Sequence, residues 1–152
     1  MKSKIIYFIL LLTIVVSPFL FKWLIEHNED NFSCRGKITF YKDNTQYSVQ
    51  VKYVFDGGKG NVVSIGEYSE LGKKTRLITQ DLSFNYYRKG NEFTMVSTQS
   101  LLTETQAKIL NPLVPDFYLY KDRGFRIEIH QQGKRGLVFT TASLPIFTCT
   151  LQ

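Results

Sequence analysis

The feature that most constrains the fold is a strict alternation of apolar and polar residues. It is clearest from Tyr47 to Phe55, where polar side chains separate large apolar ones, and it recurs from Phe125 to Ile129. Successive side chains of a strand point to opposite faces, so each segment is predicted to be a half-buried strand. The core of this chain is therefore expected to form between the apolar faces of β-strands.

Weaker alternation and regular turn signals extend this pattern over most of the chain. The weaker apolar alternations lie at residues 38–40, 82–86, 93–95 and 137–139. Gly, Asn and Asp gather between the predicted strands at residues 43–44, 56–60, 72–73, 89–91, 122–124 and 133–136. Such spacing predicts sequential hairpins, and hence an antiparallel meander of about eight strands. We expect a mainly β, barrel-like fold, because a flat sheet of this size would leave two long edges open.

One segment departs from the strand pattern. Thr103 followed by Gln106 has the spacing of a capping box, and Pro112 ends the helical stretch. We predict one short helix over residues 104–110, between the first five strands and the last three or four. A helix in this position more often covers or plugs a sheet than binds a ligand.

The N-terminal segment predicts a membrane anchor. Lys2 and Lys4 precede a run from Ile5 to Phe21 that contains no charged side chain. Extended to Ile25, this run would be about 31 Å long as a helix, enough to cross a hydrocarbon core of about 30 Å. The alternative is a cleaved signal peptide, but small residues suited to cleavage do not follow the run.

The predicted anchor sets the domain boundaries and the topology. We expect a cytoplasmic stub and transmembrane helix over residues 1–25, a linker over residues 26–31 and a β domain over residues 32–152. Basic residues precede the run and acidic residues follow it, which places the N-terminus in the cytoplasm and the β domain outside it.

The two cysteines fit an exported domain. Cys34 and Cys149 lie near the two ends of the predicted β domain. In an oxidising compartment they are expected to form one disulfide between the first and last strands, worth about 4.7 kcal/mol in the chain-entropy model. The alternative is a pair of free buried thiols.

Several function classes are excluded by the residues present. With only two histidines, His27 and His130, the chain offers no metal cluster and no base for a nucleophile, so we expect no enzyme activity, catalytic residue, metal or cofactor. The net charge is +6 with no long basic run, so nucleic acid is not an expected partner.

The inward faces of the predicted strands are rich in aromatic residues. These side chains either fill the interior or leave room for one small apolar ligand, since about eight strands enclose just enough space for either. The candidate lining residues are Phe40, Val51, Tyr53, Phe84, Tyr86, Phe93, Met95, Ile127, Ile129 and Phe139.

Two short cysteine-bearing segments carry a family resemblance. Phe32–Gly36 (Phe-Ser-Cys-Arg-Gly) and Pro145–Cys149 (Pro-Ile-Phe-Thr-Cys), together with the basic start and retained hydrophobic run, resemble the FidL-like small membrane proteins of enterobacteria. These look like accessory subunits of membrane-anchored transcription regulators of the ToxR/CadC type, similar in role to ToxS and VtrC. Only Cys34 and Cys149 can be matched by position, and no catalytic motif is carried over.

The resemblance implies a single-pass inner-membrane protein whose periplasmic domain pairs with that of the regulator as a heterodimer. It also implies a shared, lipocalin-like barrel that admits a bile salt. An unclosed barrel edge would accept a partner strand through main-chain hydrogen bonds. We therefore expect an accessory subunit that binds and stabilises such a regulator.

The alternative is a stand-alone envelope protein that binds a bile acid or fatty acid in its own barrel. The two hypotheses differ in the expected structure. A solitary binding protein should have a closed sheet with a hollow interior, whereas an accessory subunit should have a gap or an apolar edge.

Overall fold

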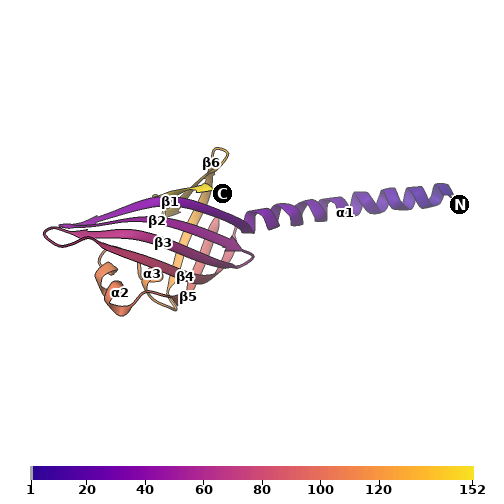
Figure 1. The fold of residues 1–152 in the computed structure, drawn as a ribbon. Coiled ribbons are helices and arrows are strands. Elements are labelled where there is room, and N and C mark those ends of the chain that lie inside the picture. The colour runs from indigo at the N-terminus through magenta and orange to yellow at the C-terminus, as the bar shows by residue number, and fades with distance from the viewer. Residues whose placement is uncertain (1) are drawn as a thin grey trace.

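The computed structural model describes the backbone of residues 2–152 and the side chains of residues 7, 9–24 and 30–152. A long N-terminal helix projects from one end of a β-barrel (Figure 1). The elements are, in chain order, α1 (Lys2–Asp30), β1 (Asn31–Lys42), β2 (Thr45–Asp56), β3 (Lys59–Glu70), β4 (Arg76–Lys89), β5 (Glu92–Ser100), α2 (Glu104–Leu110), α3 (Asp116–Leu119), β6 (Gly124–Gln132), β7 (Gly136–Thr141) and β8 (Leu144–Leu151).

The barrel is closed, with each strand antiparallel to its neighbours in chain order from β1 to β8. Full-length hairpins join the early strands, as in the β2–β3 register from Thr45↔Glu70 to Asp56↔Lys59. Closure comes from β1 and β8, which pair at Cys34↔Leu151 and Arg35↔Thr150. The predicted mainly β, antiparallel barrel of about eight strands is confirmed.

The strands are unequal in length, which makes the barrel asymmetric. β1 to β4 have 12, 12, 12 and 14 residues, whereas β5 to β8 have 9, 9, 6 and 8. β5 pairs with β6 only over residues 92–96, so residues 97–100 of β5 continue beyond that pairing. The segment with α2 and α3 follows β5 and lies below the long strands in Figure 1.

The predicted helix at residues 104–110 is confirmed as α2, together with its capping box. The Thr103 hydroxyl accepts from the Gln106 backbone N–H (3.3 Å), and the Thr103 N–H donates to Gln106 Oε1 (3.0 Å). The structure adds a second short helix, α3, that was not predicted. Phe117 and Leu119 of α3 are buried against the barrel core.

The N-terminal segment is helical up to the start of the barrel. α1 is helical through Asp30, and β1 begins at Asn31, so the predicted linker at residues 26–31 comprises the last residues of the helix and the first residue of β1. Among the residues whose side chains are described, no helix has the length and apolar character needed to cross a membrane. The side chains of residues 1–6, 8 and 25 of the predicted anchor lie outside the described part of the chain.

The end of α1 is bonded to the barrel through Asp30. The Tyr86 hydroxyl donates to the Asp30 carbonyl oxygen (2.8 Å), and Arg88 forms an ion pair with the Asp30 carboxylate (3.1 Å). The Gly57 N–H also donates to the Asp30 carbonyl (3.2 Å). The junction between helix and barrel is therefore held by side-chain and backbone contacts.

Stacked and edge-to-face rings fill the barrel at the end nearer α1. The Phe55 ring lies 5.5 Å from Phe84, 5.2 Å from Tyr86 and 5.2 Å from Phe93, all in edge-to-face geometry. Such arrangements stabilise a core beyond the area they bury. Aromatic rings therefore pack the centre of this half of the interior.

The predicted disulfide is present between β1 and β8. Cys34 and Cys149 are bonded, with their Cα atoms 5.6 Å apart, a normal separation for a disulfide. Both residues are buried. The bond lies beside the Cys34↔Leu151 pair and so reinforces the place where the barrel closes.

Candidate functional site

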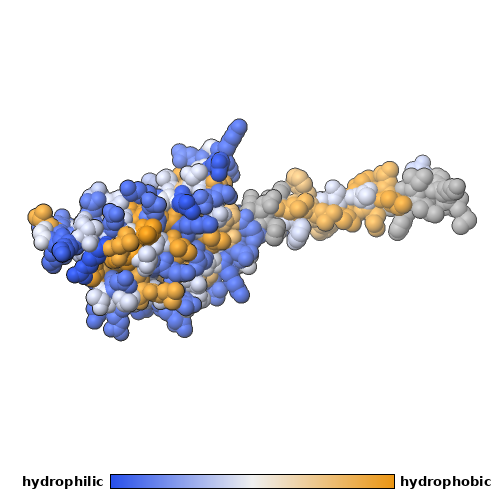
Figure 2. Space-filling view, in the orientation of Figure 1, coloured by the Kyte–Doolittle hydropathy of each residue, from blue (hydrophilic) through white to orange (hydrophobic). Residues whose placement is uncertain are grey.

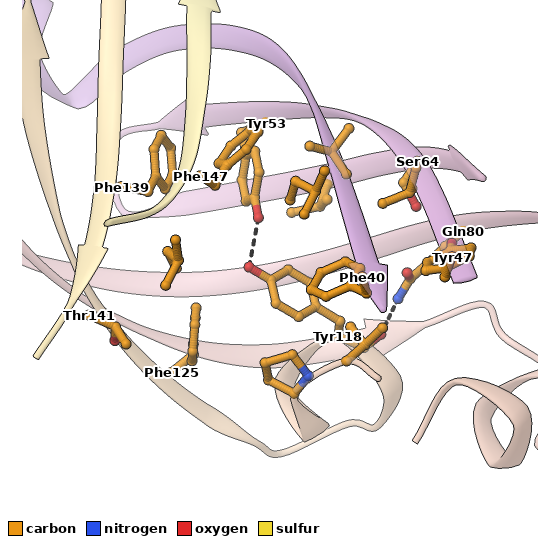
Figure 3. A pocket seen from close by; sticks show the side chains of 17 residues that line it. Phe40, Tyr47, Tyr53, Ser64, Gln80, Tyr118, Phe125, Phe139, Thr141 and Phe147 are labelled. Atoms are coloured by element: carbon orange, nitrogen blue, oxygen red, sulfur yellow. Dashed lines mark hydrogen bonds between the residues drawn. The ribbon is translucent and has the colours of Figure 1, made fainter. Parts of the chain in front are cut away.

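The candidate site is a cavity of about 170 Å³ inside the barrel (Figure 3). Its walls come from β1 to β4, from β6 to β8 and from the α3 region. The lining residues are Ile38, Phe40, Tyr47, Val49, Val51, Tyr53, Val62, Ser64, Gln80, Val114, Pro115, Tyr118, Phe125, Phe139, Thr141, Ile146 and Phe147.

The body of the cavity is apolar and carries no charged side chain. Val51 and Val62 lie on adjacent strands, and the rings of Phe139 and Phe147 lie 5.0 Å apart on β7 and β8. A charged group moved into such a place would lose its hydration without gaining a counter-charge. The lining therefore suits an uncharged, mainly apolar molecule.

A pair of tyrosines bridges the interior from α3 to β2. The hydroxyl groups of Tyr118 and Tyr53 are 2.7 Å apart (Figure 3). The Gln80 side-chain amide also donates to the backbone carbonyl of Tyr118. α3 is therefore fixed to β2 through its side chain and to β4 through its backbone.

Both bridging hydroxyls remain neutral at physiological pH. Burial raises the pKa of Tyr118 to about 12, an effect that its hydrogen bond with Tyr53 partly offsets. Burial also raises the pKa of Tyr53 well above the usual value, and the neighbouring Tyr118 adds to the effect. The bridge is thus a hydrogen bond between uncharged phenols.

The cavity has one polar end, formed by Tyr47, Ser64 and Gln80 from β2, β3 and β4 (Figure 3). Ser64 pairs with Gln80 across the sheet, so their side chains share the inward face. Both are buried, at 5% and 7% exposure. Polar residues at inward positions are unusual in a core, and here they meet at one place.

The Tyr47 hydroxyl at this polar end is buried without a hydrogen-bond partner among the described residues. Burial raises the pKa of Tyr47 to about 12, and the neighbouring Ser64 hydroxyl offsets part of the effect. The ring lies over Gly66 on β3, where an added Cβ would come within 2.6 Å of it. Gly66 thus leaves the space that the Tyr47 ring occupies.

The cavity opens where β1 and β8 diverge. The register pairs of β1 with β8 end at Arg35, although β1 continues to Lys42. We call the region between residues 37–42 of β1 and 144–147 of β8 the seam. The partly exposed lining residues Ile38 and Phe40 and the exposed Ile146 lie along it, so the seam borders the mouth of the cavity.

The structure distributes the ten candidate lining residues over three places. Four of them line the cavity: Phe40, Val51, Tyr53 and Phe139. Two others, Phe93 and Ile129, border a second hollow together with Phe32 and Arg88. The remaining four lie in the buried core and line neither hollow: Phe84, Tyr86, Met95 and Ile127.

Several cavity residues were missed by the sequence analysis. Ser64 and Gln80 are polar, so a search for apolar alternation passes over them, and only the register of β3 with β4 would have placed them inward. Tyr118 lies on the unpredicted α3. Tyr47 lies on a predicted strand, but the alternation pattern alone does not mark it as a ligand-binding residue.

The cavity offers no evident metal site. Over the part of the chain that the structure describes, no three His, Cys, Asp or Glu side chains are grouped so that they could hold a metal ion. The polar groups at the cavity are hydroxyls and one amide, which act by hydrogen bonding.

A family model, described as the YqeJ C-terminal domain, matches residues 31–149. The match runs from the first residue of β1 to Cys149 in β8 and therefore covers the barrel. No curated protein and no solved structure matches the chain. These comparisons provide no support for a relation to FidL-like proteins, ToxS or VtrC.

Proposed function

The chain belongs to the YqeJ C-terminal domain family, and we propose that its barrel binds a small, mainly apolar molecule in the cavity that ends at Tyr47. The observation that carries the proposal is an apolar cavity of about 170 Å³ inside a closed barrel. Cavities of about 150 Å³ lined by Leu, Ile and Phe take up benzene. The expected ligand is therefore of similar size.

The size and lining favour such a ligand over a whole bile salt or fatty acid. Either of these molecules carries a carboxylate, for which the lining has no cationic partner. In our proposal, a bile salt or fatty acid would have to leave its charged end at the mouth. We therefore place the smaller, uncharged ligand first.

A matched pair of substitutions on β3 tests this proposal. Val62 lines the cavity and is 1% exposed, whereas Val63 is 47% exposed. Toluene binding to the full chain, followed by protein NMR shifts, should be lost in Val62→Phe because the larger ring fills the cavity. It should be retained in Val63→Phe. Equal binding by both variants, or none by the wild type, would refute the proposal.

We propose that the barrel works outside the cytoplasm, held at the inner membrane by α1, with its N-terminus cytoplasmic. Two observations support this. The disulfide is typical of an oxidising compartment. Apolar side chains are exposed along α1, among them Leu11, Phe19 and Phe21 (Figure 2).

Fractionation of cells tests this location. The full chain should sediment with membranes, and a phosphatase fused after Gln152 should be active only if exported. A chain that stays in the cytosolic fraction would contradict this part of the proposal.

A second candidate function is that of an accessory subunit, and the seam favours it. Beyond Arg35, β1 has no register partner in β8, so its outer edge can accept a strand from another protein. We propose the extracytoplasmic domain of a membrane-anchored regulator of the ToxR/CadC type as that partner, in a heterodimer.

Co-purification with such a domain tests this second candidate. Substituting Thr39→Pro should weaken the association, because Pro removes a backbone donor from β1 and restricts its backbone. A complex unaffected by changes in residues 37–42 would show that the seam is not the interface.

A further inference from the structure

The polar end of the cavity carries information about ligand chemistry beyond size. Resting on the proposed function, we propose that the cavity selects an uncharged ligand with one hydroxyl or carbonyl group, which forms a hydrogen bond with the Tyr47 hydroxyl. Ser64 and Gln80 border the same end and complete its polar surface.

The first argument is the unmet hydrogen bond of Tyr47. Buried hydroxyls in folded proteins are almost always bonded, because leaving one unpaired costs free energy. The Tyr47 hydroxyl is buried and forms no hydrogen bond of normal geometry with the described residues, and the Ser64 side chain is the one group that interacts with it. Its residue lines the cavity. A ligand atom that reaches the hydroxyl after a small shift of the ring would supply the missing partner, since the oxygen itself has almost no accessible surface in the ligand-free barrel.

The second argument is the contrast with the other cavity tyrosines. The hydroxyls of Tyr53 and Tyr118 are 2.7 Å apart and bond each other. Gln80 likewise donates its amide to the Tyr118 carbonyl. The groups that hold α3 in place thus form hydrogen bonds of normal geometry, whereas the Tyr47 hydroxyl has only the Ser64 side chain near it.

The third argument concerns charge. None of the side chains that line the cavity is charged, so a carboxylate at the polar end would receive hydrogen bonds but no compensating positive charge. A phenol, alcohol or ketone avoids that cost. The aromatic walls, including Phe139 and Phe147, suit a ligand with a ring.

The experiment compares three probes of the same shape on the full chain: toluene, 4-methylphenol and 4-methylbenzoate. Affinities are measured from protein NMR shifts for the wild type, Tyr47→Phe and Tyr68→Phe. Tyr68 is the control because it pairs with Tyr47 across the sheet but does not line the cavity. The full chain is kept in detergent because α1 exposes apolar side chains. The probes also dissolve in the detergent, but to the same extent for every variant, so this loss cancels when variants are compared.

We expect the affinity ratio of 4-methylphenol to toluene to fall about tenfold in Tyr47→Phe, as for the loss of one hydrogen bond. The ratio should be unchanged in Tyr68→Phe. 4-Methylbenzoate should bind at least about 100-fold more weakly than 4-methylphenol to the wild type. Ser64→Ala should lower the same ratio by a smaller factor. This variant replaces Tyr47→Phe in the test if Tyr47→Phe does not fold.

Failure of this inference is distinguishable from failure of the proposed function. If toluene and 4-methylphenol both bind but their ratio is the same in Tyr47→Phe and Ser64→Ala as in the wild type, the polar end does not select the ligand. If 4-methylbenzoate binds as tightly as 4-methylphenol, the preference for an uncharged ligand is wrong. If no probe binds, or binding survives in Val62→Phe, the cavity is not the binding site and the proposed function falls with the inference.

Discussion

The Tyr118 hydroxyl meets the Tyr53 hydroxyl at 2.7 Å, so a four-residue helix is joined to a barrel strand 65 positions earlier in the chain. A helix this short has no stability of its own. Its position depends on this bond, on the Gln80 contact with its backbone, and on the burial of Phe117 and Leu119. The bridge therefore determines how one wall of the cavity is placed.

Breaking the bridge from one side should destabilise the barrel. We expect Tyr118→Phe to lower the free energy of unfolding by about 1–3 kcal/mol, because it leaves the Tyr53 hydroxyl buried without a partner. The double variant with Tyr53→Phe should lose less than the sum of the two single variants. Urea unfolding measures all three. Strictly additive effects would show that the two hydroxyls do not interact.

Removal of the Tyr47 hydroxyl should have the opposite effect. Because this group has no partner among the described residues, Tyr47→Phe is expected to leave the stability of the ligand-free protein unchanged or to raise it by about 1 kcal/mol. The same urea unfolding assay applies, with Tyr118→Phe as the contrasting variant. A loss of more than about 1 kcal/mol would mean that the hydroxyl is bonded after all.

Alkaline pH should destabilise the barrel through its buried tyrosines. Burial raises the pKa of Tyr47 in the folded chain from its ordinary value of 10.0 to about 12, so ionisation of this group takes nothing from stability below about pH 10. The stabilisation is lost as pH rises through about 12, because the unfolded chain releases its proton first. Two pKa units correspond to at most about 3 kcal/mol.

Thermal unfolding between pH 9 and pH 12 measures this effect. The decline should be shallower in Tyr47→Phe than in the wild type, while the exposed Tyr87→Phe serves as control. If stability declined equally in Tyr47→Phe and in the wild type, the pKa of Tyr47 would not be the cause of the alkaline destabilisation.

Loss of the disulfide should be among the most damaging changes. The bond joins residues 115 positions apart, and the chain-entropy model gives about 4 to 5 kcal/mol for a loop of this length. We expect Cys34→Ser with Cys149→Ser to lose several kcal/mol of unfolding free energy. Backbone hydrogen exchange should also accelerate relative to the wild type, and the acceleration should be greater in β1 and β8 than in β2 and β3. Uniform acceleration over all strands would argue against a local role at the closure.

Glycine at position 66 should be required by the Tyr47 ring. Gly66→Ala would bring a Cβ within 2.6–2.8 Å of ring atoms, so we expect a loss of about 1–3 kcal/mol. The double variant Gly66→Ala with Tyr47→Leu should recover part of the lost stability, because Leu is smaller than Tyr and leaves room for the added Cβ. Gly124→Ala is the control, because an added Cβ there meets only the Met95 carbonyl at 4.0 Å. Equal losses at positions 66 and 124 would show that the ring is not the cause.

Much of the fold could be predicted because its signals are local. Strand alternation, as from Tyr47 to Phe55, reports which face is buried, and the Thr103–Gln106 spacing reports a helix start. The cysteine pairing was accessible because the chain contains only two cysteines. These features depend on neighbours in the sequence and need no knowledge of the barrel.

The remaining features depend on long-range contacts or on weak turn signals. The turn between β7 and β8 uses Ala142 and Ser143 at positive φ (46° and 66°), without the Gly or Asn that usually marks such a turn. α3 is held by the barrel instead of by its own sequence. The polar end of the cavity arises from strand register, which alternation of apolar residues does not report.

The disulfide also decides how the molecule bears mechanical load. A pull on α1 reaches the barrel at Asn31, three residues before Cys34, and the covalent bond passes that force directly to the C-terminal strand. The first strand cannot be peeled away while that bond holds. After reduction, only the backbone pairing of β1 with β8 at Cys34↔Leu151 and Arg35↔Thr150 would resist such a pull.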